Sequence, residues 1–196
     1  MGHRRRLPDS KPQNHGGLSK TPTIGFELLI VAMESFRVNR DLPEGRYRLR
    51  EVFSGLEEVE SLNAYIGSPT LLKRILERTD VTLTQATSYM YVNDGDGSLV
   101  VGLEYMQTAD AHYLYLDIIH ELAHVKQYLD GRELFDENYS YVDRPTEIEA
   151  YQCTVKEARK IRMTDDAIAE YLYVEWITRK EHARLLNTLG VIASPP

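Results

Sequence analysis

The chain contains a single cysteine, Cys153, among its 196 residues. One cysteine excludes intramolecular disulfides, and it also excludes the zinc and iron–sulfur sites that are assembled from several cysteines. We expect Cys153 to be a small buried side chain. A chain of this length buries about 70% of its surface on folding, so it needs no disulfide or structural metal for stability. Any metal site is therefore expected to serve a function rather than the fold.

Long apolar segments are also missing from the sequence. The most apolar stretch, residues 24–33, is shorter than a membrane-spanning helix of roughly 18 or more residues, and it contains Glu27. This stretch starts more than twenty residues after Met1, and no small-residue cleavage site follows it, which is unlike an export signal. We therefore expect a cytoplasmic protein without a membrane partner.

Excess positive charge is confined to the first 22 positions. Residues 1–22 contain five basic side chains and one acidic side chain, a net charge of +4, which leaves −11 of the total of −7 for the remaining residues. An acidic body repels phosphates, so nucleic acid is not expected as a partner except through the basic segment. We interpret residues 1–22 as a flexible basic tail and residues 23–196 as one domain. The tail could be a solvated terminus, a partner-binding arm or a latch over the acidic body.

The order of the elements predicts an α+β fold. Two runs rich in β-branched and aromatic residues, 89–92 and 98–105, flank a turn sequence and predict an antiparallel hairpin. Residues 24–38 are apolar enough for either a helix or a strand. Helical spacing and N-cap residues predict helices over residues 56–66, 69–78, 109–129, 146–162, 164–177 and 178–189. We expect a small antiparallel sheet, an active-site helix and a C-terminal helical subdomain whose core includes Tyr171, Tyr173 and Trp176.

The helix predicted over residues 109–129 contains the sequence His120-Glu121-Leu122-Ala123-His124. Residues four apart lie on one face of a helix with Cβ atoms about 5–6 Å apart, so both imidazoles can bind one zinc ion. Glu121 is turned about a third of the way around the helix, where its carboxylate can reach a metal-bound water without being a ligand. The motif predicts a catalytic zinc site. The alternative is two surface histidines beside a helical glutamate.

A catalytic zinc site needs a third protein ligand and one open position. The residues directly after His124 offer no further histidine, so the third ligand has to come from elsewhere in the chain. Two carboxylates, Glu147 and Glu149, stand at the head of the next predicted helix. If Thr146 is the N-cap, Glu149 completes a capping box and Glu147 is free to bind metal. Glu149 is the alternative ligand.

The motif of residues 120–124, followed by a helix that begins Glu147-Ile148-Glu149-Ala150, resembles the gluzincin branch of the zincin metallopeptidases, including the minigluzincins. The resemblance covers about residues 98–151. It implies a zincin-like fold in which His120, His124 and Glu147 bind zinc.

The same resemblance bears on the residues that support the ligands. In parts of the branch an aspartate follows the Glu-x-x-Ala pattern and orients a zinc-bound histidine, whereas this sequence has Tyr151 there. On this resemblance, the orienting role falls to Asp117, to Asp143 or to a backbone carbonyl.

Zincins also place an antiparallel edge strand above the active-site helix, where an extended peptide can add as a further strand. On the resemblance, residues 98–105 form this edge. Residues 131–145 form a connection that is long for a compact domain, so we expect them to line the cleft. The candidates for stabilising an oxyanion or supporting a ligand are Tyr139, Tyr141, Arg144 and Tyr151.

Together these features predict a zinc-dependent metallopeptidase with one zinc ion per chain and a peptide or protein substrate. Glu121 would accept a proton from the zinc-bound water as the water attacks a peptide carbonyl, and would then deliver it to the leaving amine. The rival hypothesis is a regulatory or interaction module that binds zinc without turnover, with or without a nucleic-acid-binding tail.

Overall fold

The structure is a computed structural model that describes residues 35–194. The predicted basic tail, residues 1–22, lies outside the described residues, as does most of the apolar segment 24–38. The last residues of that segment form strand β1 (Arg37–Val38), which pairs antiparallel with β3 (Phe53–Ser54). The predicted mixture of helices and small sheets is confirmed for the described part of the chain.

The main sheet has four strands in the order β2 (Gly45–Arg48), β4 (Asp80–Thr84), β6 (Leu99–Gly102) and β5 (Met90–Val92). Strands β2 and β5 are antiparallel to their neighbours, but β4 and β6 are parallel. The prediction of an antiparallel sheet is therefore wrong for the central pair. The chain passes from β4 to the outer position of β5 and returns as β6 between them. The periodicity of apolar residues identifies strands, but it does not determine the order in which the strands pair within the sheet.

The predicted hairpin is confirmed as β5 and β6, which pair through Met90 with Val101 and Val92 with Leu99. The second strand is shorter than predicted, because it ends at Gly102 and helix α5 (Leu103–Thr108) follows directly. It is also not the edge strand: β6 lies inside the sheet, and β5 is the edge. The edge beside the candidate site is therefore formed by residues 90–92 rather than 98–105.

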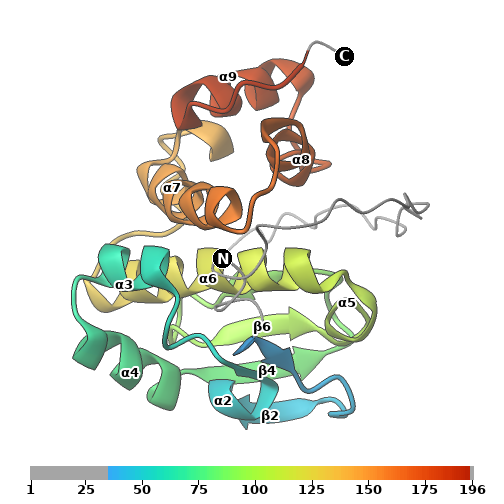
Figure 1. Cartoon of the computed structure of the whole chain (residues 1–196). Helices are drawn as coiled ribbons and strands as arrows, with labels where there is room; N and C mark the ends of the chain where they lie inside the picture. Colours follow the sequence, from blue (N-terminus) through green and yellow to red (C-terminus); the bar gives the residue numbers. More distant parts are fainter. Residues whose placement is uncertain (1–34, 195–196) are drawn as a thin grey trace.

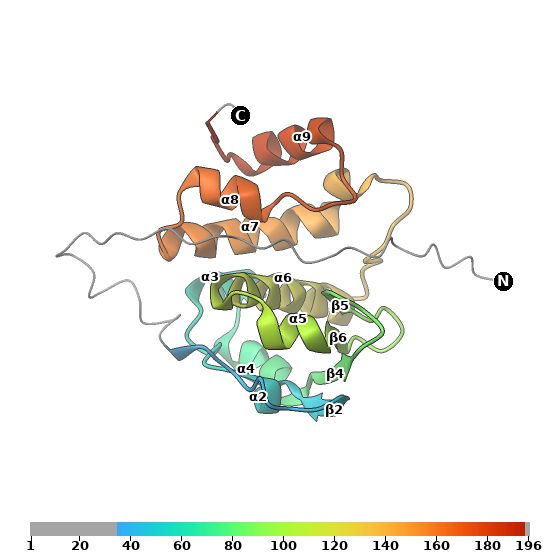
Figure 2. The same cartoon turned by 90° about the vertical axis from the view of Figure 1, so that its right-hand side faces the viewer.

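The long helix α6 (Ala111–Leu129) lies between the sheet and α7 (Pro145–Lys160), as Figures 1 and 2 show. Twelve of its 19 residues are buried, because it packs against both neighbours. Beside it lie α3 (Glu60–Ile66) and α4 (Pro69–Arg78), and the one-turn helix α2 (Leu49–Val52) lies below them in Figure 1. Helix α4 has the predicted bounds, with Ser68 as its N-cap and Pro69 at its first position.

The predicted C-terminal helices are α7, α8 (Asp165–Tyr171) and α9 (Arg179–Leu189), on the side of α6 away from the sheet (Figure 2). Thr164 and Thr178 cap α8 and α9, as predicted. Helix α8 ends at Tyr171 and not at residue 177. Tyr173 and Trp176 are consequently 49% and 45% exposed, so the expectation that they pack in the core is wrong.

Helix α7 begins two residues earlier than the capping argument assumed. Arg144 occupies the N-cap position and Pro145 the first helical position, where its fixed φ suits a helix start. The hydroxyl of Thr146 donates to the carbonyl of Leu134 instead of capping the helix. The predicted capping box of Thr146 and Glu149 is therefore absent, and Glu147 takes the third helical position.

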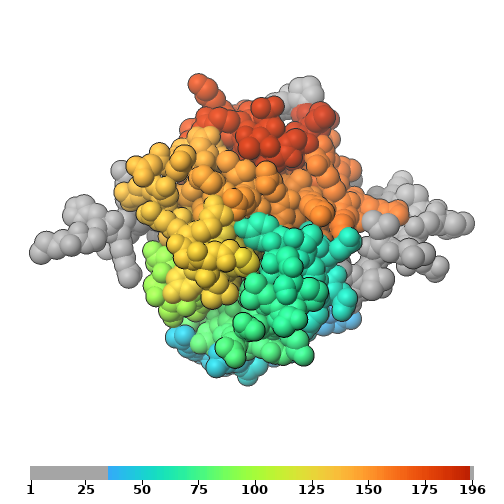
Figure 3. Space-filling view, turned by 90° about the vertical axis from the view of Figure 1, so that its left-hand side faces the viewer, coloured from blue at the N-terminus to red at the C-terminus, as the bar shows by residue number. Residues whose placement is uncertain are grey.

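One hydrophobic core runs from Phe36 to Val191 and joins the sheet side to the C-terminal helices. Cys153 is buried in it, as predicted. Figure 3 shows the segment after α6, coloured yellow to light orange, on the surface beside α3 and α4. Within residues 35–194, no helix combines the length and the apolar character that crossing a membrane requires.

Candidate metal centre

Three of the predicted ligands meet in the structure. Nε2 of His120 and Nε2 of His124 are 3.0 Å apart, and both face Oε2 of Glu147, at 3.4 and 3.6 Å. A tetrahedral ion with bonds of about 2.0–2.1 Å keeps its ligand atoms about 3.3 Å apart. The three distances therefore fit one small ion at the centre of the triangle.

Two helices bring these donors together. Helix α6 presents His120 and His124 one turn apart on the face toward α7, and the first turn of α7 presents Glu147. The three side chains are 6%, 6% and 4% exposed. This is the one group of three such donors within residues 35–194 that is close enough to hold a metal ion. The alternative of two surface histidines is thus wrong.

The charge balance of the cluster also suits a cation. Oε2 of Glu147 is buried and has no hydrogen-bond partner among the described residues. Burial raises the pKa of Glu147, but the two imidazoles outweigh burial and hold it well below its usual range. Burial lowers the pKa of His120. Burial also lowers the pKa of His124, but Glu147 outweighs it and raises the pKa to about 9. The buried carboxylate thus attracts positive charge, which a metal ion would supply.

Glu121 is buried on α6 directly after His120 and is 8% exposed. Burial raises its pKa to about 8; the carboxylates of Glu147 and Asp117 add to this, and His124 opposes it. Its carboxylate accepts a hydrogen bond from the backbone N–H of Val92 on β5. Glu121 therefore lies between the donor cluster and the edge strand.

The free edge of β5 faces this side of the site. The N–H of Gly102 donates to the carbonyl of Tyr89, and the N–H of Asn93 donates to the carbonyl of Ser98. The backbone groups of Tyr89 and Asn93 therefore face β6. Because backbone groups alternate along a strand, the N–H and C=O groups of Met90 and Val92 point to the open edge.

Gln127 supports the cluster and was not predicted from the sequence. Its Oε1 lies 2.7 Å from Nδ1 of His124, and the side chain is buried. The signal available in the sequence was its position three residues after His124, on the same face of the helix. Nδ1 of His120 has no partner within the described residues, and its ring packs against Tyr151 at 4.3 Å between centroids.

The two aspartates suggested for orienting a histidine lie elsewhere. Asp117 is partly buried and accepts hydrogen bonds from the hydroxyls of Tyr105 and Tyr171. Asp143 is exposed and pairs with Arg184 on α9. Neither carboxylate contacts an imidazole nitrogen of His120 or His124. The carboxylate of Asp117 is bonded to the two tyrosines, and that of Asp143 is bonded to Arg184. Helix spacing places Asp117 on the same face of α6 as His120, three residues before it. This spacing does not reveal the tyrosines that bind Asp117.

Of the candidates for oxyanion stabilisation, three lie near the cluster. The hydroxyls of Tyr141 and Tyr151 are 2.6 Å apart, and burial raises the pKa of both phenols. Nη1 of Arg144 lies 3.5 Å from Oε1 of Glu147, the oxygen that faces away from the histidines. Tyr139 is 46% exposed, and no contact joins it to the donors.

Glu149, the alternative ligand, points away from the donors. Its carboxylate pairs with Arg132 and accepts a hydrogen bond from the hydroxyl of Tyr65 at 3.2 Å. Its attraction to Arg132 outweighs burial and lowers its pKa. Glu149 is therefore part of a polar network beside the cluster and not one of the three clustered donors.

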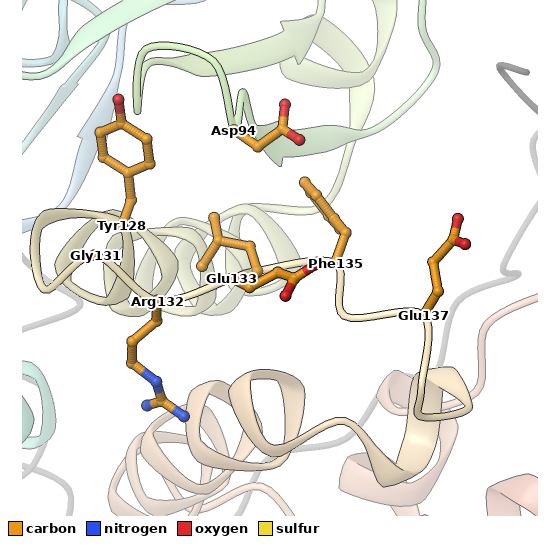
Figure 4. A pocket seen from close by; sticks show the side chains of 8 residues that line it. Asp94, Tyr128, Gly131, Arg132, Glu133, Phe135 and Glu137 are labelled. Atoms are coloured by element: carbon orange, nitrogen blue, oxygen red, sulfur yellow. The ribbon is translucent and has the colours of Figure 1, made fainter. Parts of the chain in front are cut away.

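The loop after α6 lines a pocket of about 550 Å³, shown in Figure 4. None of the three donors lines it, so it is separate from the metal centre. Figure 4 also shows the guanidinium of Arg132 directed away from Asp94, toward α7, where it meets Glu149. The lining residues are Asp94, Tyr128, Gly131, Arg132, Glu133, Leu134, Phe135 and Glu137.

Comparisons of the chain with protein-family models, with curated proteins and with solved structures found no match.

Proposed function

We propose that the protein is a zinc-dependent metallopeptidase of the gluzincin type, with a zincin-like arrangement of sheet, α6 and α7. The proposal rests on the donor triangle of His120, His124 and Glu147, whose spacing matches the ligand spacing of tetrahedral zinc. Two imidazoles and one carboxylate leave the fourth position open, which is the ligand set of a catalytic rather than a structural zinc site. A zinc ion held there would polarise a carbonyl and lower the pKa of a water molecule.

The substrate in this proposal is an extended peptide segment. The outward N–H and C=O groups of Met90 and the outward C=O group of Val92 can pair with its backbone as an additional strand. A strand added at this edge lies beside Glu121, because Glu121 already accepts the N–H of Val92. Backbone pairing of this kind selects an unfolded or extended segment and not a particular side chain.

Glu121 is the catalytic base in this proposal. It accepts one proton from the water whose oxygen attacks the peptide carbonyl carbon, and it delivers that proton to the amine nitrogen as the C–N bond breaks. The hydroxyls of Tyr141 and Tyr151 are the candidate donors to the carbonyl oxygen, where negative charge develops. Their raised pKa values keep both phenols protonated at neutral pH.

Replacement of Glu121 by Gln tests the proposal. The variant should keep zinc, because Glu121 is not one of the donors, and it should lose at least about 100-fold in cleavage rate, the usual contribution of a general base. The assay is digestion of a peptide library by the zinc-loaded protein, read by mass spectrometry, beside a zinc titration. Glu137→Gln, an exposed change in the loop after α6, is the control. A zinc-loaded wild-type protein that cleaves no peptide, or an equally active Glu121→Gln variant, would contradict the proposal. The first result would favour a zinc-binding module without turnover.

A further inference from the structure

The side-chain amide of Gln127 joins one donor of the metal centre to the helix that carries another. Gln127 is 1% exposed on α6. Its Oε1 lies 2.7 Å from Nδ1 of His124. Its Nε2 donates to the backbone carbonyl of Thr146 at 3.0 Å, and Thr146 directly precedes Glu147 on α7. The amide therefore contacts both sides of the cluster.

These contacts fix which nitrogen of His124 carries a proton. The carbonyl of Thr146 can only accept, so the amide group must turn its NH₂ toward Thr146 and its oxygen toward His124. The oxygen can only accept, so Nδ1 of His124 must be the donor. In the neutral imidazole, Nε2 then keeps its lone pair, and it faces His120 and Glu147.

The amide is itself held in place from a third element. Its Nε2 also donates to the hydroxyl of Tyr65 on α3 at 2.9 Å, and that hydroxyl donates to Glu149. Glu149 is paired with Arg132 from the loop after α6. Rotation of the Gln127 amide would break the bonds to Thr146 and Tyr65 together, so its orientation is determined by α3 and α7.

We propose that Gln127 is a positioning residue for the metal centre, which holds His124 in the form with Nδ1 protonated and Nε2 free to bind the ion. The inference rests on the metal site of the proposed function but not on peptidase activity. His120 offers an internal comparison, because its Nδ1 has no partner among residues 35–194 and its ring is held by packing on Tyr151. Gln127 should therefore act on His124 alone.

The first test uses the unaltered, zinc-loaded protein and needs no variant. Long-range ¹H–¹⁵N NMR spectra distinguish the two ring nitrogens of each histidine. The expected result is that His124 binds zinc through Nε2 and carries a slowly exchanging proton on Nδ1, because that proton is bonded to a buried amide oxygen. A His124 that binds zinc through Nδ1, or whose Nδ1 proton exchanges as fast as that of an exposed histidine, would overturn the proposal.

The second test replaces Gln127 by Met, which is similar in size but has no strong acceptor. Zinc affinity, measured by competition with a chelator, should fall about 10- to 100-fold, as it does when an outer partner of a ligand is removed. The NMR signals of His124 should change while those of His120 stay. Gln152→Met is the matched control: it makes the same change at an exposed position of α7, so it should bind zinc nearly as the wild type does. Equal affinity of Gln127→Met and wild type would overturn the proposal. Both readouts are independent of cleavage, so they decide the role of Gln127 whether or not the protein is a peptidase.

Discussion

Replacement of Glu147 by Gln should separate the metal ligand from its neighbouring carboxylate. Glu147 is 4% exposed, and its Oε2 faces both imidazoles, whereas Glu149 pairs with Arg132 outside the cluster. Glutamine keeps the size and shape of the side chain but cannot carry the charge. Glu149→Gln is the matched change two residues away on the same helix.

The expected loss follows from the number of ligands. Zinc sites with four protein ligands bind with about 10–16 kcal/mol at neutral pH, or about 2.5–4 kcal/mol for each ligand. At 1.4 kcal/mol for each factor of ten, removal of one of three donors should lower zinc affinity by about 10²- to 10³-fold. Glu149→Gln removes the charge of a partly exposed ion pair, which contributes at most about 1 kcal/mol to stability, and its amide oxygen can still accept from Tyr65, so zinc affinity should stay near the wild-type value.

Zinc affinity is measured by competition with a chelator of known strength, and cobalt substitution gives an absorption spectrum that reports the number of ligands. Thermal unfolding in the presence of a chelator shows whether each variant is folded without metal. Wild-type affinity in Glu147→Gln, or an equal loss in the two variants, would refute the assignment of the third ligand.

Two further predictions concern the frame around the site. Asp143→Asn should cost at most about 1 kcal/mol at pH 7, because the pair with Arg184 is largely exposed. Hydrogen bonds from Arg184 lower the pKa of Asp143, so its contribution is present above the unfolded pKa near 3.8 and is lost as the pH falls through the folded value. Urea unfolding of both proteins at pH 7 and pH 3 should show a smaller difference at pH 3, and a difference as large at pH 3 as at pH 7 would refute this. Gly97→Ala should destabilise by more than Gly67→Ala, measured by urea unfolding. Both positions have positive φ, which costs about 1–2 kcal/mol for alanine, but only at Gly97 would the new Cβ lie 2.4 Å from the ring of Tyr128. Equal losses would show that the ring moves aside freely.

The parts of the fold that were predictable from the sequence have local causes. Helix α4 begins where Ser68 and Pro69 indicate, because an N-cap hydroxyl and a proline at the first position act within a few residues. The spacing of His120 and His124 is likewise a property of one helix. The sequence alone therefore predicted that the two imidazoles lie close together.

The parts that were not predictable depend on contacts between distant segments. The position of β6 between β4 and β5 depends on the packing of the whole sheet, and strand patterns alone do not encode it. Glu147 was favoured over Glu149 through a capping box that the structure does not contain. Its place beside the histidines comes from the packing of α7 on α6. Gln127 was missed because its partners, Tyr65 and Thr146, come from two other helices.

The donors lie on opposite sides of the contact between α6 and α7, and this has a consequence for the lifetime of the protein. Two donors belong to α6, and the third is 23 positions further along the chain on α7. An ion in the cluster would therefore cross-link the two helices, and it would bind the folded chain, in which the three donors meet, in preference to the unfolded one. By mass action, free zinc at 100 times its dissociation constant adds about 2.7 kcal/mol to the stability of the fold, and at 1,000 times about 4.1 kcal/mol. With zinc as the proposed ion, the zinc supply would determine how often the connection between α6 and α7 opens to proteases, and zinc starvation would shorten the life of the protein as well as empty its site.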